Sequence, residues 1–140
     1  MTYADNNWER KIAFPGYKMY MNSIQARILL NNFIYFENKM RALRSLVDIY
    51  NKEFNYENSS LHLFRIEVLN NQKFIENMRK KGIMCGIHYP ALHLNSVYNK
   101  KSSNCPQTKK LQNRTVSLPM NEKLSFLEKE YIIDKVKENI

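Results

Sequence analysis

Apolar residues recur every three to five positions along residues 23–55. They are Ile24, Ile28, Phe33, Phe36, Met40, Leu43, Val47, Tyr50 and Phe54. This spacing lines one face of an α-helix, and Asn22 or Ser23 can cap its start. Because no helix-breaking residue interrupts the pattern, we expect one long, kinked helix or a pair of helices.

The pattern changes to a two-residue alternation after a polar link at residues 55–60. Between residues 61 and 69, three apolar residues alternate with two charged ones, namely Phe64, Ile66 and Val68 with Arg65 and Glu67. Such alternation predicts a half-buried strand. Asn70 or Asn71 can then cap a helix that ends at Gly82, and residues 83–88 follow as a second predicted strand.

The last third of the chain contains a long polar stretch between two apolar segments. Residues 94–114 predict an exposed loop with at most a short helix, and residues 115–118 predict a third strand that Pro119 stops. Ser125 and Glu128 have capping-box spacing, so the last helix is expected to start there. Its apolar positions, expected to cover the sheet, are Ile132, Ile133, Val136 and Ile140. The fold class is therefore α+β: an N-terminal helix or helix pair, then about three strands covered by helices.

Residues 81–93 combine a helix stop, an apolar strand and a polar exit. His88 and Tyr89 follow the strand, Pro90 ends its pairing, and His93 lies three residues further on. Strand ends of this kind often carry ligand-facing groups. A histidine at such a place is nevertheless more often structural, so the sequence leaves both readings open.

Two sulfur and two nitrogen ligands near this segment raise the question of a metal. They are Cys85, His88, His93 and Cys105, but only the first pair has the short spacing of a structural zinc site. We therefore expect no metal. We also expect no catalytic residue here, because a thiol in an apolar strand has a raised pKa and is a poor nucleophile.

Composition limits the remaining function classes. The 140 residues include 22 Lys and Arg against 13 Asp and Glu, a net charge of +9. The basic residues are scattered among asparagines, which disfavours nucleic-acid binding. The sequence lacks both a membrane-length apolar run and a signal peptide core, so we expect a cytoplasmic protein without a membrane partner and with reduced cysteines.

Four ordered motifs resemble one family of enzymes. Residues 16–26, reading Gly-Tyr-Lys-Met-Tyr-Met-Asn-Ser-Ile-Gln-Ala, are similar to the Gly-Tyr-Asn-x-Arg-Met-x-x-Ile-Gln-Ala-Ala signature of the DegT/DnrJ/EryC1/StrS sugar aminotransferases. The others are Arg44 with Tyr50, residues 82–93 with their His-Tyr-Pro-Ala-Leu-His end, and Ser-Leu-Pro-Met at residues 117–120. Tyr20 replaces the usual Arg and Arg27 the usual second Ala, and Lys109 stands near a common Glu position. These departures weaken the inference of intact function.

The resemblance implies a pyridoxal-phosphate enzyme of the aspartate aminotransferase fold, acting as a homodimer on keto-sugar nucleotides. Residues 1–22 would correspond to a connector from the large domain, residues 23–55 to the connecting helix or helix pair, and residues 56–140 to the small C-terminal domain. Lys18 stands where the family residue reaches the cofactor phosphate of the neighbouring subunit. His88, Tyr89 and His93 would lie on the substrate side.

The family's Schiff-base lysine region has no counterpart in these motifs. We therefore expect a truncated or split enzyme that holds no cofactor and is inactive alone, and that binds pyridoxal phosphate only when a large-domain chain completes it. The alternative is a non-catalytic module that docks on a full-length paralogue. A basic nucleic-acid binder is the least favoured hypothesis.

Overall fold

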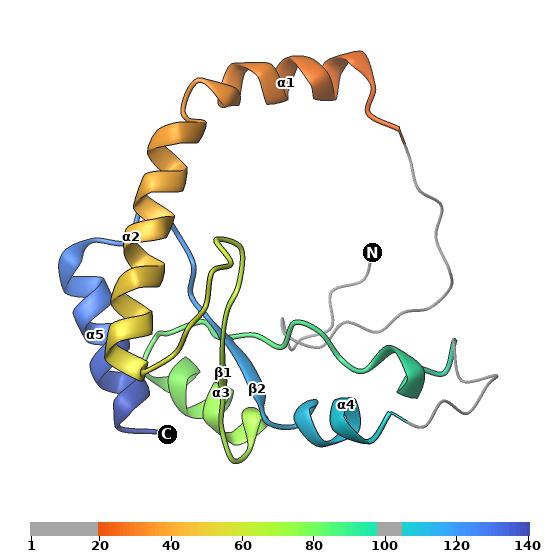
Figure 1. Ribbon diagram of the computed structural model, residues 1–140, viewed down its shortest axis with the longest axis vertical. Coiled ribbons are helices and arrows are strands. Elements are labelled where there is room, and N and C mark those ends of the chain that lie inside the picture. The colour runs from red at the N-terminus through yellow and green to blue at the C-terminus, as the bar shows by residue number, and fades with distance from the viewer. Residues whose placement is uncertain (1–19, 98–104) are drawn as a thin grey trace.

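The computed structural model describes residues 20–97 and 105–140 (Figure 1). The elements are, in order, α1 (Ser23–Phe33), α2 (Phe36–Phe54), β1 (Phe64–Glu67), α3 (Asn71–Lys80), the 3₁₀-helix η1 (Leu92–Leu94), α4 (Pro106–Leu111), β2 (Thr115–Leu118) and α5 (Phe126–Lys137). The α+β class is as expected. Within the described ranges, no helix has the length and apolarity needed to cross a bilayer.

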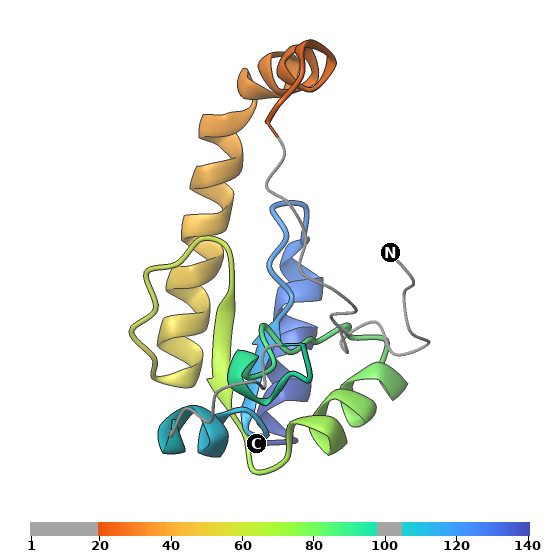
Figure 2. The same ribbon diagram turned by 90° about the vertical axis from the view of Figure 1, so that its right-hand side faces the viewer.

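The N-terminal pattern forms a helix pair and not one continuous helix. The break falls at residues 34 and 35, and α1 turns away from α2 across the end of the molecule (Figures 1 and 2). Asn22 caps α1 in a capping box with Gln25, which decides between the two expected cap residues. No residue of α1 is buried, whereas α2 buries Leu43, Leu46, Val47 and Tyr50. The domain boundaries on either side of this pair stay a prediction.

The core lies on one face of a small antiparallel sheet. Strands β1 and β2 pair in the register Phe64↔Leu118, Arg65↔Ser117, Ile66↔Val116 and Glu67↔Thr115. The expected alternation is confirmed, since Phe64 and Ile66 are buried while Arg65 and Glu67 are exposed. Side chains from α2, α3 and α5 complete the core, and α2 packs beside α5 (Figure 1).

The predicted third strand at residues 83–88 reduces to a single bridge, Gly86↔Ser117. The next pairs of such a ladder would use the backbone of Thr115 and Pro119. Pro119 has no N–H, and its carbonyl accepts a hydrogen bond from the Tyr50 hydroxyl at 3.2 Å. The Thr115 carbonyl accepts one from Asn71 Nδ2 at 3.3 Å. Pro119 thus offers no donor, and both carbonyls already have a partner, which favours pairing that stops at one bridge.

The helix ends follow the local signals in the sequence. Gly82 has a φ of 75° just after α3, and the amide of Ile83 closes the turn on the Met78 carbonyl at 2.9 Å. Ser125 and Glu128 form the expected capping box at the start of α5. The expectation that Ile140 covers the sheet is wrong: α5 ends at Lys137, so Ile140 lies beyond the helix and is 63% exposed.

Candidate functional site

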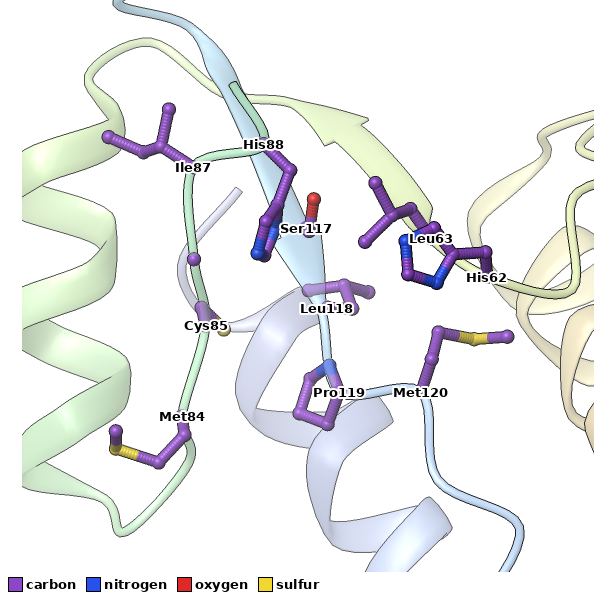
Figure 3. Close-up of a pocket in the computed structure, with 11 residues that line it drawn as sticks. His62, Leu63, Met84, Cys85, Ile87, His88, Ser117, Leu118, Pro119 and Met120 are labelled. Carbon is purple, nitrogen blue, oxygen red and sulfur yellow. The ribbon is translucent and has the colours of Figure 1, made fainter. Parts of the chain in front are cut away.

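One pocket collects residues from two of the four motifs that the sequence singles out. Its volume is about 280 Å³, and it opens beside the Gly86–Ser117 bridge (Figure 3). It is lined by His62, Leu63, Met84, Cys85, Gly86, Ile87, His88, Ser117, Leu118, Pro119 and Met120. We call it the His88 pocket. The segment 84–88 forms one wall, and residues 117–120 form the floor between this wall and His62 (Figure 3).

Gly86 positions the His88 imidazole. A Cβ atom built on Gly86 would lie 2.8 Å from His88 Cε1, closer than real Cβ atoms approach their neighbours. The ring therefore lies directly over the backbone of Gly86, next to its bridge partner Ser117 (Figure 3). Only glycine leaves room for this arrangement.

The other two expected substrate residues are not in the pocket. Tyr89 is 56% exposed, and its ring packs edge-on against His88 with 5.2 Å between centroids. His93 is half-buried in η1 and does not line the pocket. The structure thus brings only His88 of the three into the pocket, and substrate contact by any of them stays a prediction.

Ser117 supplies a buried hydroxyl at the pocket floor. The residue is 3% exposed, and within the described ranges its Oγ makes no hydrogen bond. A buried hydroxyl without a partner costs about 1–3 kcal/mol. The position therefore carries a polar group that a ligand or a water molecule would satisfy.

His62 is a pocket residue that the sequence reading did not identify. It lies just before β1, on the opposite side of the pocket from His88 (Figure 3). A polar residue at the start of an alternating strand is a weak signal, because the alternation does not fix which way such a residue points. The antiparallel pairing of β1 with β2 is what brings it to the floor residues Pro119 and Met120.

On the core side of the His88 pocket the surroundings are apolar, and they favour the neutral forms of Cys85 and Tyr50. Burial raises the pKa of the Cys85 thiol to about 12, in line with the prediction of a poor nucleophile. Burial also raises the pKa of Tyr50 above its usual value, and the nearby Cys85 adds to this. Tyr50 of the second motif thus has a structural role: its hydroxyl donates a hydrogen bond to the backbone carbonyl of Pro119 in the fourth motif.

The sequence profile of one family matches nearly the whole chain. Residues 1–137 match the DegT/DnrJ/EryC1/StrS aminotransferase family. The chain belongs to this family. The resemblance carried by the four motifs is therefore confirmed, and the family is one of pyridoxal-phosphate enzymes.

Proteins similar to this chain are considerably longer than it is. An uncharacterized protein of Methanocaldococcus jannaschii is 26% identical over 144 residues, which cover 87% of this chain and 37% of that protein. The crystal structure of a DegT DnrJ EryC1 StrS aminotransferase from Brucella abortus is 25% identical with a TM-score of 0.74, over 88% of this chain and 39% of its own.

The sugar aminotransferase CalS13 from Micromonospora echinospora shares the fold, with 18% identity and a TM-score of 0.79 over 89% of this chain and 37% of its own. The chain therefore spans about two fifths of the length of these similar proteins.

The His88 pocket is lined by neither a lysine nor an aspartate, the two side chains that hold the pyridoxal ring in an aminotransferase. Lys18, the expected contact to a cofactor phosphate, lies outside the described residues. Within residues 20–97 and 105–140, no three His, Cys, Asp or Glu side chains are placed to hold a metal ion.

A second hollow lies where α1 meets α2. Its volume is about 720 Å³, and its wall is mainly apolar, including Leu29, Phe33, Phe36 and Met40. The rings of Phe33 and Phe36 stack at 5.5 Å between centroids. Helix α1 has no buried residue, so this hollow and the exposed side chains of α1 form a large apolar surface at one end of the chain's structure.

Proposed function

We propose that this chain forms the small-domain side of a sugar-nucleotide aminotransferase, acting in amino-sugar or cell-surface polysaccharide biosynthesis. The observation that carries the proposal is the family match over residues 1–137. In this proposal a large domain holds pyridoxal phosphate, which supplies the electron withdrawal that amino transfer requires. The 140-residue chain alone does not transaminate, because its pocket offers no lysine and no carboxylate to the cofactor.

The pocket supports this division of roles. His88 projects over Gly86 from the strand end that the family motif supplies, and an imidazole there can orient a substrate hydroxyl or carbonyl. Tyr89 and His93, which follow on the same exit segment, would contact the substrate outside the pocket. Lys18 would meet the cofactor phosphate of a neighbouring subunit.

The apolar end of the molecule fits the same proposal. All the large apolar residues of α1 are exposed, including Ile24 at 73% and Phe33 at 62%. An 11-residue helix is barely stable in water unless a partner buries its apolar face. We propose that the large domain is this partner.

A chimera tests the proposal directly. The large domain of the Brucella abortus aminotransferase is joined to residues 1–140, which replace the matching 39% of that chain. We expect the chimera to retain pyridoxal phosphate and to transfer an amino group from glutamate to a keto-sugar nucleotide. His88→Gln in the chimera should lower kcat/KM about tenfold, the worth of one hydrogen bond to a polar group in the transition state.

Two controls accompany the chimera: the large domain alone and the 140-residue chain alone, neither of which should transaminate. A folded chimera that binds the cofactor without amino transfer would show the proposal to be wrong. If, instead, the chain alone binds a full-length family member and changes its rate, the docking-module alternative gains support.

A further inference from the structure

The His88 pocket has hydrogen-bond donors but no negative charge. The imidazoles of His62 and His88 line it from two sides, and the Ser117 hydroxyl forms part of its floor (Figure 3). None of its lining residues is an aspartate or a glutamate. The remaining titratable neighbour, Cys85, is a neutral thiol because burial opposes its ionisation. Nothing that lines the pocket would therefore repel an anion.

The sheet register adds a permanent positive charge beside the pocket. Arg65 is the cross-strand partner of Ser117, so its side chain lies on the same face of the sheet as the Ser117 hydroxyl. Arg65 is exposed, which leaves its guanidinium able to move toward the pocket. On a chain of net charge +9, the local and the overall charge favour the same kind of ligand.

The buried Ser117 hydroxyl is the second, independent sign of a ligand. Its residue is 3% exposed, and within the described part of the chain the oxygen has no hydrogen-bond partner. In most proteins such a buried position holds an apolar residue, or a polar residue with a hydrogen-bond partner. An oxyanion in the pocket accepts hydrogen bonds from a hydroxyl and from imidazole N–H groups, and so would satisfy it.

We propose that the His88 pocket is an oxyanion subsite, in which Ser117, His62 and His88 bind one carboxylate or phosphate group of a small molecule. The volume of about 280 Å³ suits one charged end of a substrate better than a whole sugar nucleotide. The inference rests on the proposed function in one respect: the group belongs either to the amino donor, as a carboxylate, or to the sugar nucleotide, as a phosphate.

Titration of the isotope-labelled 140-residue chain by NMR tests the subsite without any large domain. Glutarate and inorganic phosphate are the two probes, added at about pH 6, and sodium chloride at matched ionic strength is the blank. We expect saturable shifts of the His62 and His88 imidazole signals and of the Gly86 amide. Tighter glutarate binding assigns the subsite to the amino donor, and tighter phosphate binding assigns it to the nucleotide.

Two variants and a matched control locate the binding. His62→Gln and Ser117→Ala should each weaken the tighter probe about tenfold, the usual effect of losing one hydrogen bond to a charged group. Ser96→Ala makes the same chemical change as Ser117→Ala at an exposed residue outside the pocket, and should leave the affinity unchanged. His62 is exposed, so its variant should fold even if Ser117→Ala does not.

Shifts that chloride reproduces, or equal affinity in the wild type and His62→Gln, would overturn the subsite. Because no cofactor or large domain takes part, this result would leave the aminotransferase proposal standing. Conversely, an inactive chimera would leave a measured oxyanion affinity unaffected.

Discussion

Cys85 shows how its surroundings set the chemistry of a side chain that the sequence only partly defines. The residue is 6% exposed, and its burial raises the thiol pKa to about 12. The apolar segment around it made this direction predictable, because a thiolate loses its hydration when apolar side chains surround it. The contact of this region with Tyr50 was not predictable, since it depends on how α2 packs against the segment after β2.

The raised pKa makes stability depend on alkaline pH. The folded chain holds the Cys85 proton more tightly than the unfolded chain, whose thiol has a pKa of 9.0. The stabilisation is therefore complete below about pH 9 and is lost as the pH rises toward 12, by up to about 1.4 kcal/mol per pH unit. Urea unfolding at several pH values should show a steeper decline for the wild type than for Cys85→Ala.

The pKa of Tyr50 is raised mainly by its burial, which both chains share, so most of the Tyr50 contribution cancels in this comparison. Parallel declines for the wild type and Cys85→Ala between about pH 9 and pH 10.5 would show that the thiol is not protected by the fold.

At the scale of elements, the sequence predicted those whose signals are local. The alternation at residues 64–67, the stop at Gly82 and the capping box at Ser125 all appear where expected. The third strand failed because its pairing depends on distant residues: Tyr50 and Asn71 occupy the carbonyls that a ladder would need. For the same reason the pocket could be only partly predicted: the exit motif gave His88, but cross-strand pairing brought in His62 and Ser117.

Alanine variants of Gly86 and Gly82 distinguish side-chain crowding from backbone strain. Gly86→Ala would place a Cβ atom 2.8 Å from the His88 ring, so the ring must move. We expect a loss of about 1–3 kcal/mol in the free energy of unfolding, together with a changed His88 imidazole signal in the NMR spectrum. Gly82→Ala is the matched control, since its Cβ atom would meet nothing within 4 Å.

Gly82 has a φ of 75°, so its alanine variant should lose about 1 kcal/mol through strain while the His88 signal stays unchanged. Identical His88 spectra for Gly86→Ala and the wild type would refute the positioning role of Gly86.

At the scale of the whole molecule, apolar surface is divided unevenly. The sheet, α2, α3 and α5 share one core, while α1 buries none of its residues. Apolar spacing alone does not reveal this difference, because it does not say which protein surface a helix covers. Among the described residues no surface covers the apolar side chains of α1, which fits the large-domain contact proposed above.

The exposed α1 should make the isolated chain self-associate. Leu29 and Phe33 are 55% and 62% exposed and line the hollow between α1 and α2. In sedimentation velocity we expect the wild type to form concentration-dependent oligomers, and the double variant Leu29→Glu with Phe33→Glu to be mainly monomeric, since two carboxylates would have to be buried in any oligomer.

Leu69→Glu with Leu127→Glu is the matched control, because these leucines are 89% and 75% exposed but lie away from α1. The control should associate like the wild type, because hydrophobic association needs a contiguous patch and not an equal number of scattered leucines. If the wild type is a monomer at all concentrations, or if both double variants dissociate alike, α1 is not a docking surface, and the large-domain contact proposed for it must lie elsewhere.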